Sequence, residues 1–207
     1  MSTRVDQAVT SGTFSLDGGT WDVDTNVWVI GDDTECVVID APHDAGPIAE
    51  LIGDRRLIAI LCTHAHDDHV TVAQELAERY QAPVRLHPDD AVLWRMSYPD
   101  TAFVPLADDE RIAVGDAALE VRHTPGHAPG AVCFYAPALD AVFTGDTLFQ
   151  GGPGATGRSY SDFDTIVASI KSRLLSLPPA TVVHPGHGDD TSIGAEMADA
   201  ESWEKPS

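Results

Sequence analysis

Histidine and aspartate are concentrated in one short stretch, residues 63–69, which reads Thr-His-Ala-His-Asp-Asp-His. The stretch directly follows the apolar run 57–62 and precedes a segment with helical periodicity, so we expect a loop at the end of a buried strand. Imidazole and carboxylate groups together suit zinc, iron or manganese. Because His64 and His66 would point apart on a helix, the ligands must lie on a tight loop, where they can serve two adjacent metal ions.

Three later stretches place a histidine or an aspartate at the expected end of a strand, together with glycine. They are residues 124–127 (TPGH), 144–147 (TGDT) and 184–188 (HPGHG). Glycine permits the close backbone approach and the unusual dihedral angles that a packed ligand cluster requires. The sequence therefore predicts a metal site assembled from four separate segments.

The order of these residues resembles the ligand motif of the metallo-β-lactamase superfamily. The resemblance covers nearly the whole chain and implies an α/β fold, an αββα sandwich of two mixed β-sheets with helices on the outer faces. It also implies two divalent metal ions held by seven side chains. The first ion would be bound by His64, His66 and His127, the second by Asp68, His69 and His187, and Asp146 would bridge both.

Asp146 lies in the segment Phe-Thr-Gly-Asp-Thr-Leu-Phe, which is similar to the glyoxalase II-like branch of this superfamily. The true β-lactamases usually place cysteine or serine at that position, so the resemblance implies a hydroxyacyl thioester hydrolase. Two divalent ions, zinc first and iron or manganese as alternatives, would share a hydroxide held by Asp68 and Asp146. That hydroxide would attack the acyl carbonyl, and the thiol would leave as thiolate without a strong general acid.

Other functions stay open at this stage. A persulfide dioxygenase shares the fold and needs only one iron, with His64, His127 and Asp146 as its ligands. A lactonase or a β-lactamase of the same superfamily is a further alternative. A non-catalytic metal-binding module is disfavoured, because structural metal sites are usually closed and mononuclear.

Several residues are candidates for supporting roles. Arg158 follows a segment, residues 151–157, that is too rich in glycine for a strand and is interpreted as a mobile loop at the pocket mouth. Arg158 is there a candidate anchor for a substrate carboxylate, with a solvated linker as the alternative. Asp40 is a candidate to accept a hydrogen bond from a ligand imidazole. His43 is a weaker pocket candidate, and ordinary structural or solvent-facing roles are expected for His87, His123, His184, Asp67 and the acidic pairs 89–90, 108–109 and 189–190.

The expected partner is a small molecule, an acyl thioester of a low-molecular-weight thiol. Long glyoxalase II enzymes carry a further C-terminal helical region that resembles a glutathione-binding module, whereas this sequence ends about twenty residues after His187. We therefore expect a carrier thiol other than glutathione, such as mycothiol, or a loose thiol preference. The substrate, the native metal and the oligomeric state are not determined by the sequence.

Composition excludes several other classes of protein. The 207 residues include 12 basic and 33 acidic side chains, a net charge of −21, and such a surface repels nucleic acid. The sequence contains neither an 18-residue apolar run nor an apolar N-terminal segment, which argues against a membrane protein and a secreted one. We expect one cytoplasmic domain over residues 1–207, with Cys36, Cys62 and Cys133 reduced and buried.

Strand and helix patterns alternate along the chain and must position the candidate ligands. Strands are predicted at residues 26–30, 35–40, 57–62, 83–86, 111–114, 119–122, 131–135, 141–144 and 181–184. Helices are predicted at residues 44–53, 70–80, 89–95, 163–177 and 193–203. Mixed strands and helices in this order favour two sheets covered by helices.

Overall fold

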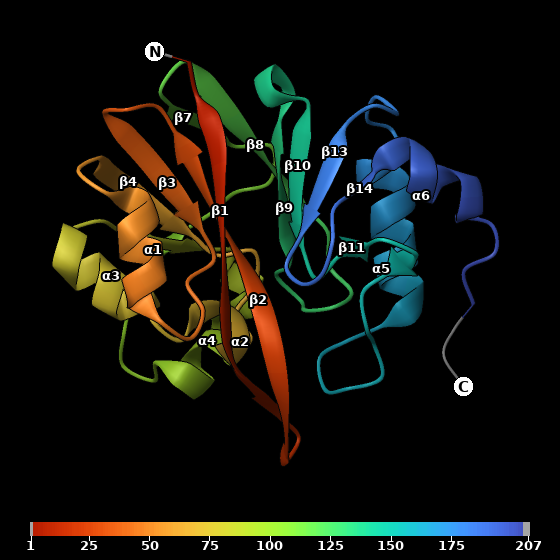
Figure 1. The fold of residues 1–207 in the computed structure, drawn as a ribbon. Coiled ribbons are helices and arrows are strands. Elements are labelled where there is room, and N and C mark those ends of the chain that lie inside the picture. Colours follow the sequence, from red (N-terminus) through yellow and green to blue (C-terminus); the bar gives the residue numbers. More distant parts are fainter. Residues whose placement is uncertain (1, 205–207) are drawn as a thin grey trace.

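The computed structural model describes residues 2–204, which form two mixed β-sheets packed face to face with helices on both outer sides (Figure 1). The helices that follow the first-sheet strands lie on one side, and those near the C-terminus lie on the other. The αββα sandwich predicted for this chain is therefore confirmed.

The first sheet contains the N-terminal half of the chain. Its strands, in spatial order, are β1 (Arg4–Leu16), β2 (Gly19–Gly31), β3 (Glu35–Ile39), β4 (Arg56–Leu61), β5 (Val84–Leu86) and β6 (Val104–Pro105). The helical elements between them are α1 (Ala45–Ile52), α2 (Asp67–Val70), α3 (Ala73–Tyr80), the 3₁₀ turn η1 (Pro88–Asp90) and α4 (Ala91–Ser97). The predicted antiparallel hairpin of 26–30 and 35–40 is confirmed as the β2–β3 pair.

The second sheet contains the C-terminal half. Its spatial order is β14 (Thr191–Ser192), β13 (Val182–Pro185), β10 (Ala141–Gly145), β9 (Val132–Ala136), β8 (Ala117–His123) and β7 (Arg111–Val114). Further elements are η2 (Pro137–Leu139), the short pair β11 (Leu148–Phe149) and β12 (Gly152–Pro153), α5 (Phe163–Ser169), its π-helical continuation η3 (Ile170–Leu174) and α6 (Ile193–Asp199).

Three apolar layers hold these elements together, and the alternation of side chains along β2 shows why. Val27 and Val29 point toward the helices of the first sheet, whereas Trp28 and Ile30 point toward the second sheet. All four side chains are at most 4% exposed, so both faces of this strand are covered. A third cluster fills the space between the second sheet and helices α5 and α6.

Three predicted helices differ from the structure in their bounds, and the one predicted at 193–203 ends earlier, at Asp199. The helix predicted at 70–80 begins earlier, at Asp67, and is divided into α2 and α3 at Thr71 and Val72. The helix predicted at 163–177 is capped by the Asp162 side chain, which accepts the Thr165 N–H, but it turns π-helical from Ile170.

The interpretation of residues 151–157 as too glycine-rich for any strand is wrong at one point. Gly152 and Pro153 form β12, which pairs with β11 immediately after Asp146. Gly152 adopts a φ of +130°, and the indole of Trp203 lies where a side chain at this position would begin. A residue without a side chain is therefore required for this close packing.

The long hairpin of β1 and β2 was missed by the sequence analysis. The two strands pair without interruption from Arg4 with Gly31 to Leu16 with Gly19, and they extend beyond the rest of the sheet (Figure 1). Their connection is the dipeptide Asp17-Gly18, with φ values of +54° and +79°. Asp-Gly with two positive φ values is the typical two-residue hairpin turn, and this signal could have revealed the element.

The three cysteines agree with the expectation that they are reduced and buried. Cys36, Cys62 and Cys133 are all free and buried, and burial raises the thiol pKa of Cys36 and Cys133 to about 11. Within residues 2–204, none of the helices has the length and apolar character needed to cross a membrane.

Candidate metal centre

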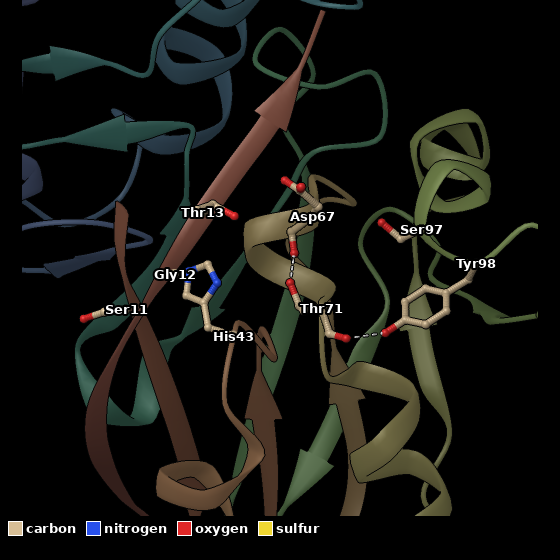
Figure 2. Close-up of a pocket in the computed structure, with 8 residues that line it drawn as sticks. All are labelled: Ser11, Gly12, Thr13, His43, Asp67, Thr71, Ser97 and Tyr98. Atoms are coloured by element: carbon tan, nitrogen blue, oxygen red, sulfur yellow. Dashed lines mark hydrogen bonds between the residues drawn. The ribbon is translucent and has the colours of Figure 1, made fainter. Parts of the chain in front are cut away.

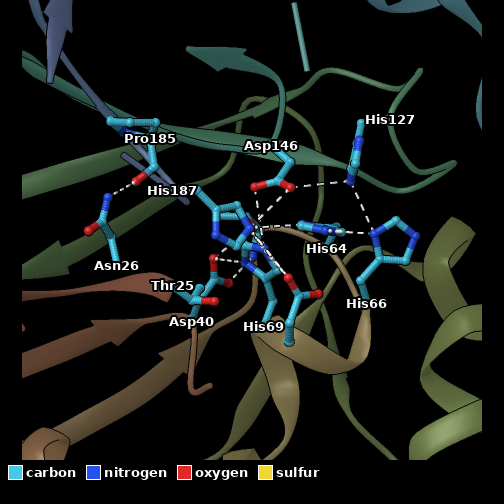
Figure 3. Close-up of polar contacts among 12 residues, drawn as sticks. Thr25, Asn26, Asp40, His64, His66, His69, His127, Asp146, Pro185 and His187 are labelled. Carbon is cyan, nitrogen blue, oxygen red and sulfur yellow. Dashed lines mark hydrogen bonds and ion pairs between the residues drawn. The ribbon is translucent and has the colours of Figure 1, made fainter. Parts of the chain in front are cut away.

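The predicted ligand residues converge although they come from distant parts of the chain. They lie in the loops and the short helix α2 that follow the ends of strands, and their side chains point toward one another (Figure 3). The loop after β4 and the adjoining helix α2 supply four of them, and the segments after β8, β10 and β13 supply one each: His64, His66, Asp68, His69, His127, Asp146 and His187. The structure therefore brings together all seven predicted side chains.

Three imidazoles form the first group. His64 Nε2 lies 3.0 Å from His66 Nδ1, and His127 Nε2 lies 3.1 Å from the same atom (Figure 3). The residues are 1%, 5% and 8% exposed, respectively, for His64, His66 and His127. Ring nitrogens that converge so closely in a buried site suit a cation at their centre, because each can present one lone pair.

The second group combines two imidazoles with a carboxylate. His69 Nε2 and His187 Nε2 lie 3.3 Å apart, and Asp68 Oδ2 lies 3.3 Å from His187 Nε2 and 3.8 Å from His69 Nε2. Asp68 and His69 are buried in helix α2, whereas the His187 side chain is 25% exposed. This group is therefore the more open of the two.

Asp146 joins the two groups. Its Oδ1 lies 3.3 Å from His69 Nε2, and its Oδ2 lies 3.5 Å from His127 Nε2 and 3.4 Å from His187 Nε2. Gly186 makes this approach possible, because an added Cβ there would lie 2.4 Å from Asp146 Oδ1. One carboxylate thus faces donor atoms of both groups, as a bridging ligand must.

In four rings, the Nδ1 atom, which points away from the ligand group, makes a hydrogen bond. A bond that Nδ1–H donates selects the tautomer whose Nε2 is unprotonated, and an unprotonated Nε2 is the form that binds metal. The partners are Thr63 Oγ1 for His64 Nδ1 at 3.1 Å, Ala155 O for His127 Nδ1 at 2.8 Å, Asp24 O for His187 Nδ1 at 2.7 Å and Asp40 Oδ2 for His69 Nδ1 at 2.8 Å. The predicted contact of Asp40 with a ligand imidazole is present.

These side chains fit divalent ions. Zinc–nitrogen bonds of about 2.0–2.1 Å in tetrahedral geometry place the nitrogens about 3.3 Å apart, close to the observed 3.0–3.3 Å between facing ring nitrogens. In addition, Asp68 Oδ1 and Asp146 Oδ1 are buried without a hydrogen-bond partner. Buried carboxylate oxygens in this state need a cation or another partner.

The two groups differ in protonation. Burial and the neighbouring imidazoles lower the pKa of His64 well below its usual value and that of His66 to about 3, so these two rings are neutral at pH 7. Burial alone would lower the pKa of His187 as well, but Asp146 and Asp68 outweigh it and raise the pKa to about 10. Asp146, Asp68 and Asp40 likewise raise the pKa of His69.

These directions predict that metal binding releases protons. Without metal at pH 7, His69 and His187 carry protons that an ion in the second group must displace, so affinity there should rise with pH until about 10. Isothermal titration of metal-free protein in buffers of different ionisation enthalpy measures the protons released. We expect the His187→Ala variant to release fewer, and an affinity independent of pH between 7 and 9 would contradict the prediction.

The remaining histidines have structural contacts, as predicted for three of them. The His184 ring packs between Trp28 and Phe143. The rings of His87 and His123 stack with centroids 4.0 Å apart and planes 15° apart. Although Asp89 brings a third donor within 4.8 Å of them, nearly parallel rings do not direct their in-plane lone pairs at one ion.

Two aspartates differ from the expectation that they face solvent. Asp67 is half-buried, because its Oδ1 accepts the Ser15 N–H of β1. Asp90 is wholly buried and accepts backbone N–H groups of Ala65 and Gly130. Both contacts join segments that are remote in sequence, so a local acidic pattern could not reveal them.

The cavity over the metal centre measures about 170 Å³, and the β1–β2 hairpin forms part of its wall. Phe14 and Val23 supply apolar surface from the hairpin, and Phe14 contacts the ring of His66 with centroids 5.1 Å apart. Across the opening, the Arg158 guanidinium lies 3.7 Å from the Trp21 ring centroid. The predicted anchor Arg158 thus lines this cavity.

A larger polar cavity of about 440 Å³ lies beside the metal centre, between β1 and helices α2 and α4 (Figure 2). His43 is part of its lining, where its Nε2 lies 3.1 Å from Thr25 Oγ1 and its ring packs against the backbone of Gly12. Tyr98 donates a hydrogen bond of 2.7 Å to the Thr71 carbonyl in the same cavity. His43 therefore supports the hairpin instead of joining the ligand groups.

A two-sheet sandwich with paired His and Asp ligand groups at one edge defines a class of metal-dependent hydrolase. Comparison with known proteins agrees: residues 20–187 match the Metallo-beta-lactamase superfamily. The chain is 33% identical over 190 residues to the probable metallo-hydrolase YqgX of Bacillus subtilis, covering 84% of this chain and 90% of YqgX. It is 32% identical over 181 residues to the hydroxyacylglutathione hydrolase GloC of Haemophilus influenzae, covering 80% and 85%.

Two solved structures show the same fold. TTHA1623 in a di-iron-bound form is 36% identical, with a TM-score of 0.77 over 84% of this chain and 93% of that one. ETHE1 from Myxococcus xanthus is 29% identical, with a TM-score of 0.70 over 89% and 80%. This chain therefore belongs to the metallo-β-lactamase superfamily and is a metallo-hydrolase of that superfamily.

Proposed function

We propose that this protein is a glyoxalase II-like thioesterase with two divalent metal ions, zinc being the preferred metal. The observation that carries the proposal is the pair of ligand groups joined by Asp146, whose two oxygens face both groups at 3.3–3.5 Å. His64, His66 and His127 would hold one ion, and Asp68, His69 and His187 the other. Bound ions would supply the Lewis-acid charge that activates water and stabilises an oxyanion.

The chain's own groups orient the reactants. The unpartnered Oδ1 of Asp68, whose Oδ2 faces His69 and His187, can accept a hydrogen bond from the attacking water and so direct the water's lone pair toward the acyl carbonyl. The apolar surface of Phe14 and Val23 covers the substrate and excludes bulk water. A thioester suits such a site, because the thiol departs as a thiolate and needs no strong general acid to protonate it.

The relatives support this choice of substrate class. GloC is named for the hydrolysis of a hydroxyacyl thioester of glutathione, and it covers most of this chain at 32% identity. The aspartate at position 146 also supports a thioester, because the segment around it resembles the glyoxalase II-like branch. The cavity of about 170 Å³ accommodates a small acyl group, so most of a larger carrier thiol would remain outside it.

The test is metal content together with activity on a substrate panel. Metal-free protein is reconstituted with zinc, iron or manganese and then assayed with acyl-glutathione, acyl-coenzyme A and acyl-mycothiol, a lactone and a β-lactam. We expect two equivalents of metal per chain, thioester hydrolysis that chelation abolishes and metal restores, and little turnover of the lactone or β-lactam. Lactone or β-lactam hydrolysis faster than every thioester would reject the proposal.

A persulfide dioxygenase, which would use iron on this fold, is the second candidate, and the iron bound by the 36% identical TTHA1623 is the observation that favours it. Such a reaction would need one iron, held by His64, His127 and Asp146. The presence of a complete second group, with Asp68, His69 and His187 mutually within 3.8 Å, favours two ions and hydrolysis. One iron per chain, with oxygen consumption and sulfite production from a persulfide, would establish the dioxygenase.

Arg158 is proposed to bind a carboxylate of the substrate. It is exposed at the cavity mouth and held by stacking on Trp21, which leaves its N–H groups free to point outward. We expect Arg158→Ala to raise KM about tenfold for a carboxylate-bearing thioester, as for loss of one charged hydrogen bond. KM for a neutral thioester should change by less than twofold.

Two further variants complete the Arg158 measurement. Arg158→Lys should recover part of the affinity, because the charge is kept but the planar stacking is lost. Arg111→Ala is the matched control, since Arg111 is an exposed arginine that pairs with Glu120 on β7 and β8. Equal effects of Arg158→Ala on charged and neutral substrates would refute the anchor.

A further inference from the structure

Asp90 is a buried carboxylate that belongs to neither ligand group. It is 0% exposed, its Oδ2 accepts the Ala65 N–H at 2.7 Å, and its Oδ1 accepts the Gly130 N–H. Ala65 lies between the ligands His64 and His66, and Gly130 lies in the turn that carries His127. One side chain is thus bonded to both loops that present the first ligand group.

The contacts of Asp90 are not those that its place in the chain would suggest. It is the N-cap residue of α4, where an aspartate usually accepts an N–H of its own helix, yet its side chain makes no such bond. Burial raises the pKa of Asp90 to about 6, against the two N–H groups that lower it, so the side chain is ionised at neutral pH. A carboxylate with two oxygens suits two converging N–H donors.

Gly130 shows how closely the two segments approach. A Cβ added at this position would lie 2.5 Å from the Asp90 backbone nitrogen and 2.9 Å from Asp90 Cβ. A residue with a side chain could not occupy this place without moving one of the segments. The loop that carries His127 is therefore packed directly on the turn that carries Asp90.

We propose that Asp90 is a positioning residue of the first metal site, which fixes the loop of His64 and His66 relative to the loop of His127. His66 Nδ1 lies 3.0 Å from His64 Nε2 and 3.1 Å from His127 Nε2. The distance to His127 depends on the relative position of the two loops. The inference rests on the proposed metal ligands, but it does not depend on which substrate is hydrolysed.

The test measures metal affinity at each site separately, by competition with a chromophoric chelator and zinc. A His187→Ala background leaves the first group intact, and a His127→Ala background leaves the second. We expect Asp90→Asn to lower affinity 10–100-fold in the first background, as for loss of a group that orients a ligand. In the second background, affinity should change by less than twofold.

Asp89→Asn is the matched control, because Asp89 is the neighbouring aspartate, its side chain is 59% exposed, and it bonds neither loop. It should leave both affinities unchanged. Equal losses in the two backgrounds would show general destabilisation and overturn the proposal, as would no loss in the first. Because no substrate is present, these outcomes are independent of the thioesterase assignment.

A second measurement needs no variant and covers the case in which Asp90→Asn does not fold. Hydrogen exchange of the Ala65 and Gly130 amides is followed in the wild-type protein with and without zinc. If Asp90 holds the loops, both amides should be protected to within about threefold whether or not metal is bound. Free exchange of both amides in the metal-free protein would overturn the proposal.

Discussion

Replacement of Asp146 by asparagine should lower thioester hydrolysis by at least about 10³-fold, the scale of loss when a central catalytic group is removed. Asp146 faces donor atoms of both ligand groups, at 3.3–3.5 Å from three imidazole nitrogens. Burial alone would raise its pKa, but His187 and His69 outweigh it and hold the pKa well below its usual value. Asparagine keeps the shape of the side chain and removes this charge.

The measurement for Asp146→Asn is kcat/KM together with metal equivalents per chain. We expect fewer than two equivalents after dialysis, because an amide oxygen is a weaker ligand than a carboxylate and cannot balance two cations. Asp189→Asn is the matched control, since Asp189 is exposed in the turn that follows His187. A variant with two bound metals and activity within tenfold of wild type would show that Asp146 does not bridge them.

Replacement of Asp40 should have the largest effect on stability. Asp40 is 2% exposed, and its oxygens accept hydrogen bonds from Thr63 N at 2.7 Å, Thr63 Oγ1 at 2.8 Å and His69 Nδ1 at 2.8 Å. Removing one partner of a buried charged pair costs about 3–5 kcal/mol. We therefore expect Asp40→Ala to lower the free energy of unfolding of the metal-free protein by that amount, measured by urea denaturation.

Asp40→Asn separates folding from metal binding. Asparagine tolerates the φ of +60° at this position, and its oxygen can still accept the Thr63 N–H. Its amide nitrogen cannot accept from His69 Nδ1, so the ring loses the bond that fixes its metal-binding tautomer. We expect a smaller loss of stability but a 10–100-fold loss of affinity in the second ligand group.

Asp44→Ala is the control for both Asp40 variants. Asp44 lies on the same loop and caps α1 by accepting the Gly46 N–H at 2.8 Å, without contact to a ligand. Loss of such a cap costs about 1 kcal/mol, and metal affinity should stay unchanged. If Asp44→Ala and Asp40→Asn had the same effect on metal affinity, the role of Asp40 would be general stability alone.

Variants of Asp146, Asp40 and Asp90 should affect different parts of the site. Asp146 acts on both ligand groups, Asp40 acts on the second through His69, and Asp90 acts on the first through the backbone of two loops. Variants of these residues should therefore differ in which metal equivalent is lost. Titration of each variant with zinc measures that difference directly.

The sequence by itself determined the fold class and the set of ligand candidates. Buried strands appear as apolar runs such as 57–62, and the residues that follow the end of a strand lie at the edge of a sheet. The position of the histidines of 63–69 therefore follows from the sequence. The ordered segments around His127, Asp146 and His187 carry glycines that permit close approach, and this local signal marked them as partners. Such features can be predicted because each depends only on residues that are adjacent in the sequence.

The tertiary structure alone decided which groups support and cover the site. Asp90 is 25 residues from Ala65 and 40 from Gly130, and its acidic neighbourhood predicted exposure, yet the packing of two loops buries it. The β1–β2 hairpin likewise places Trp21 against Arg158, which is remote in sequence. The residues of these two strands show only a weak strand pattern. A side chain's partner across such separations depends on how sheets and loops pack, and no local periodicity encodes that geometry.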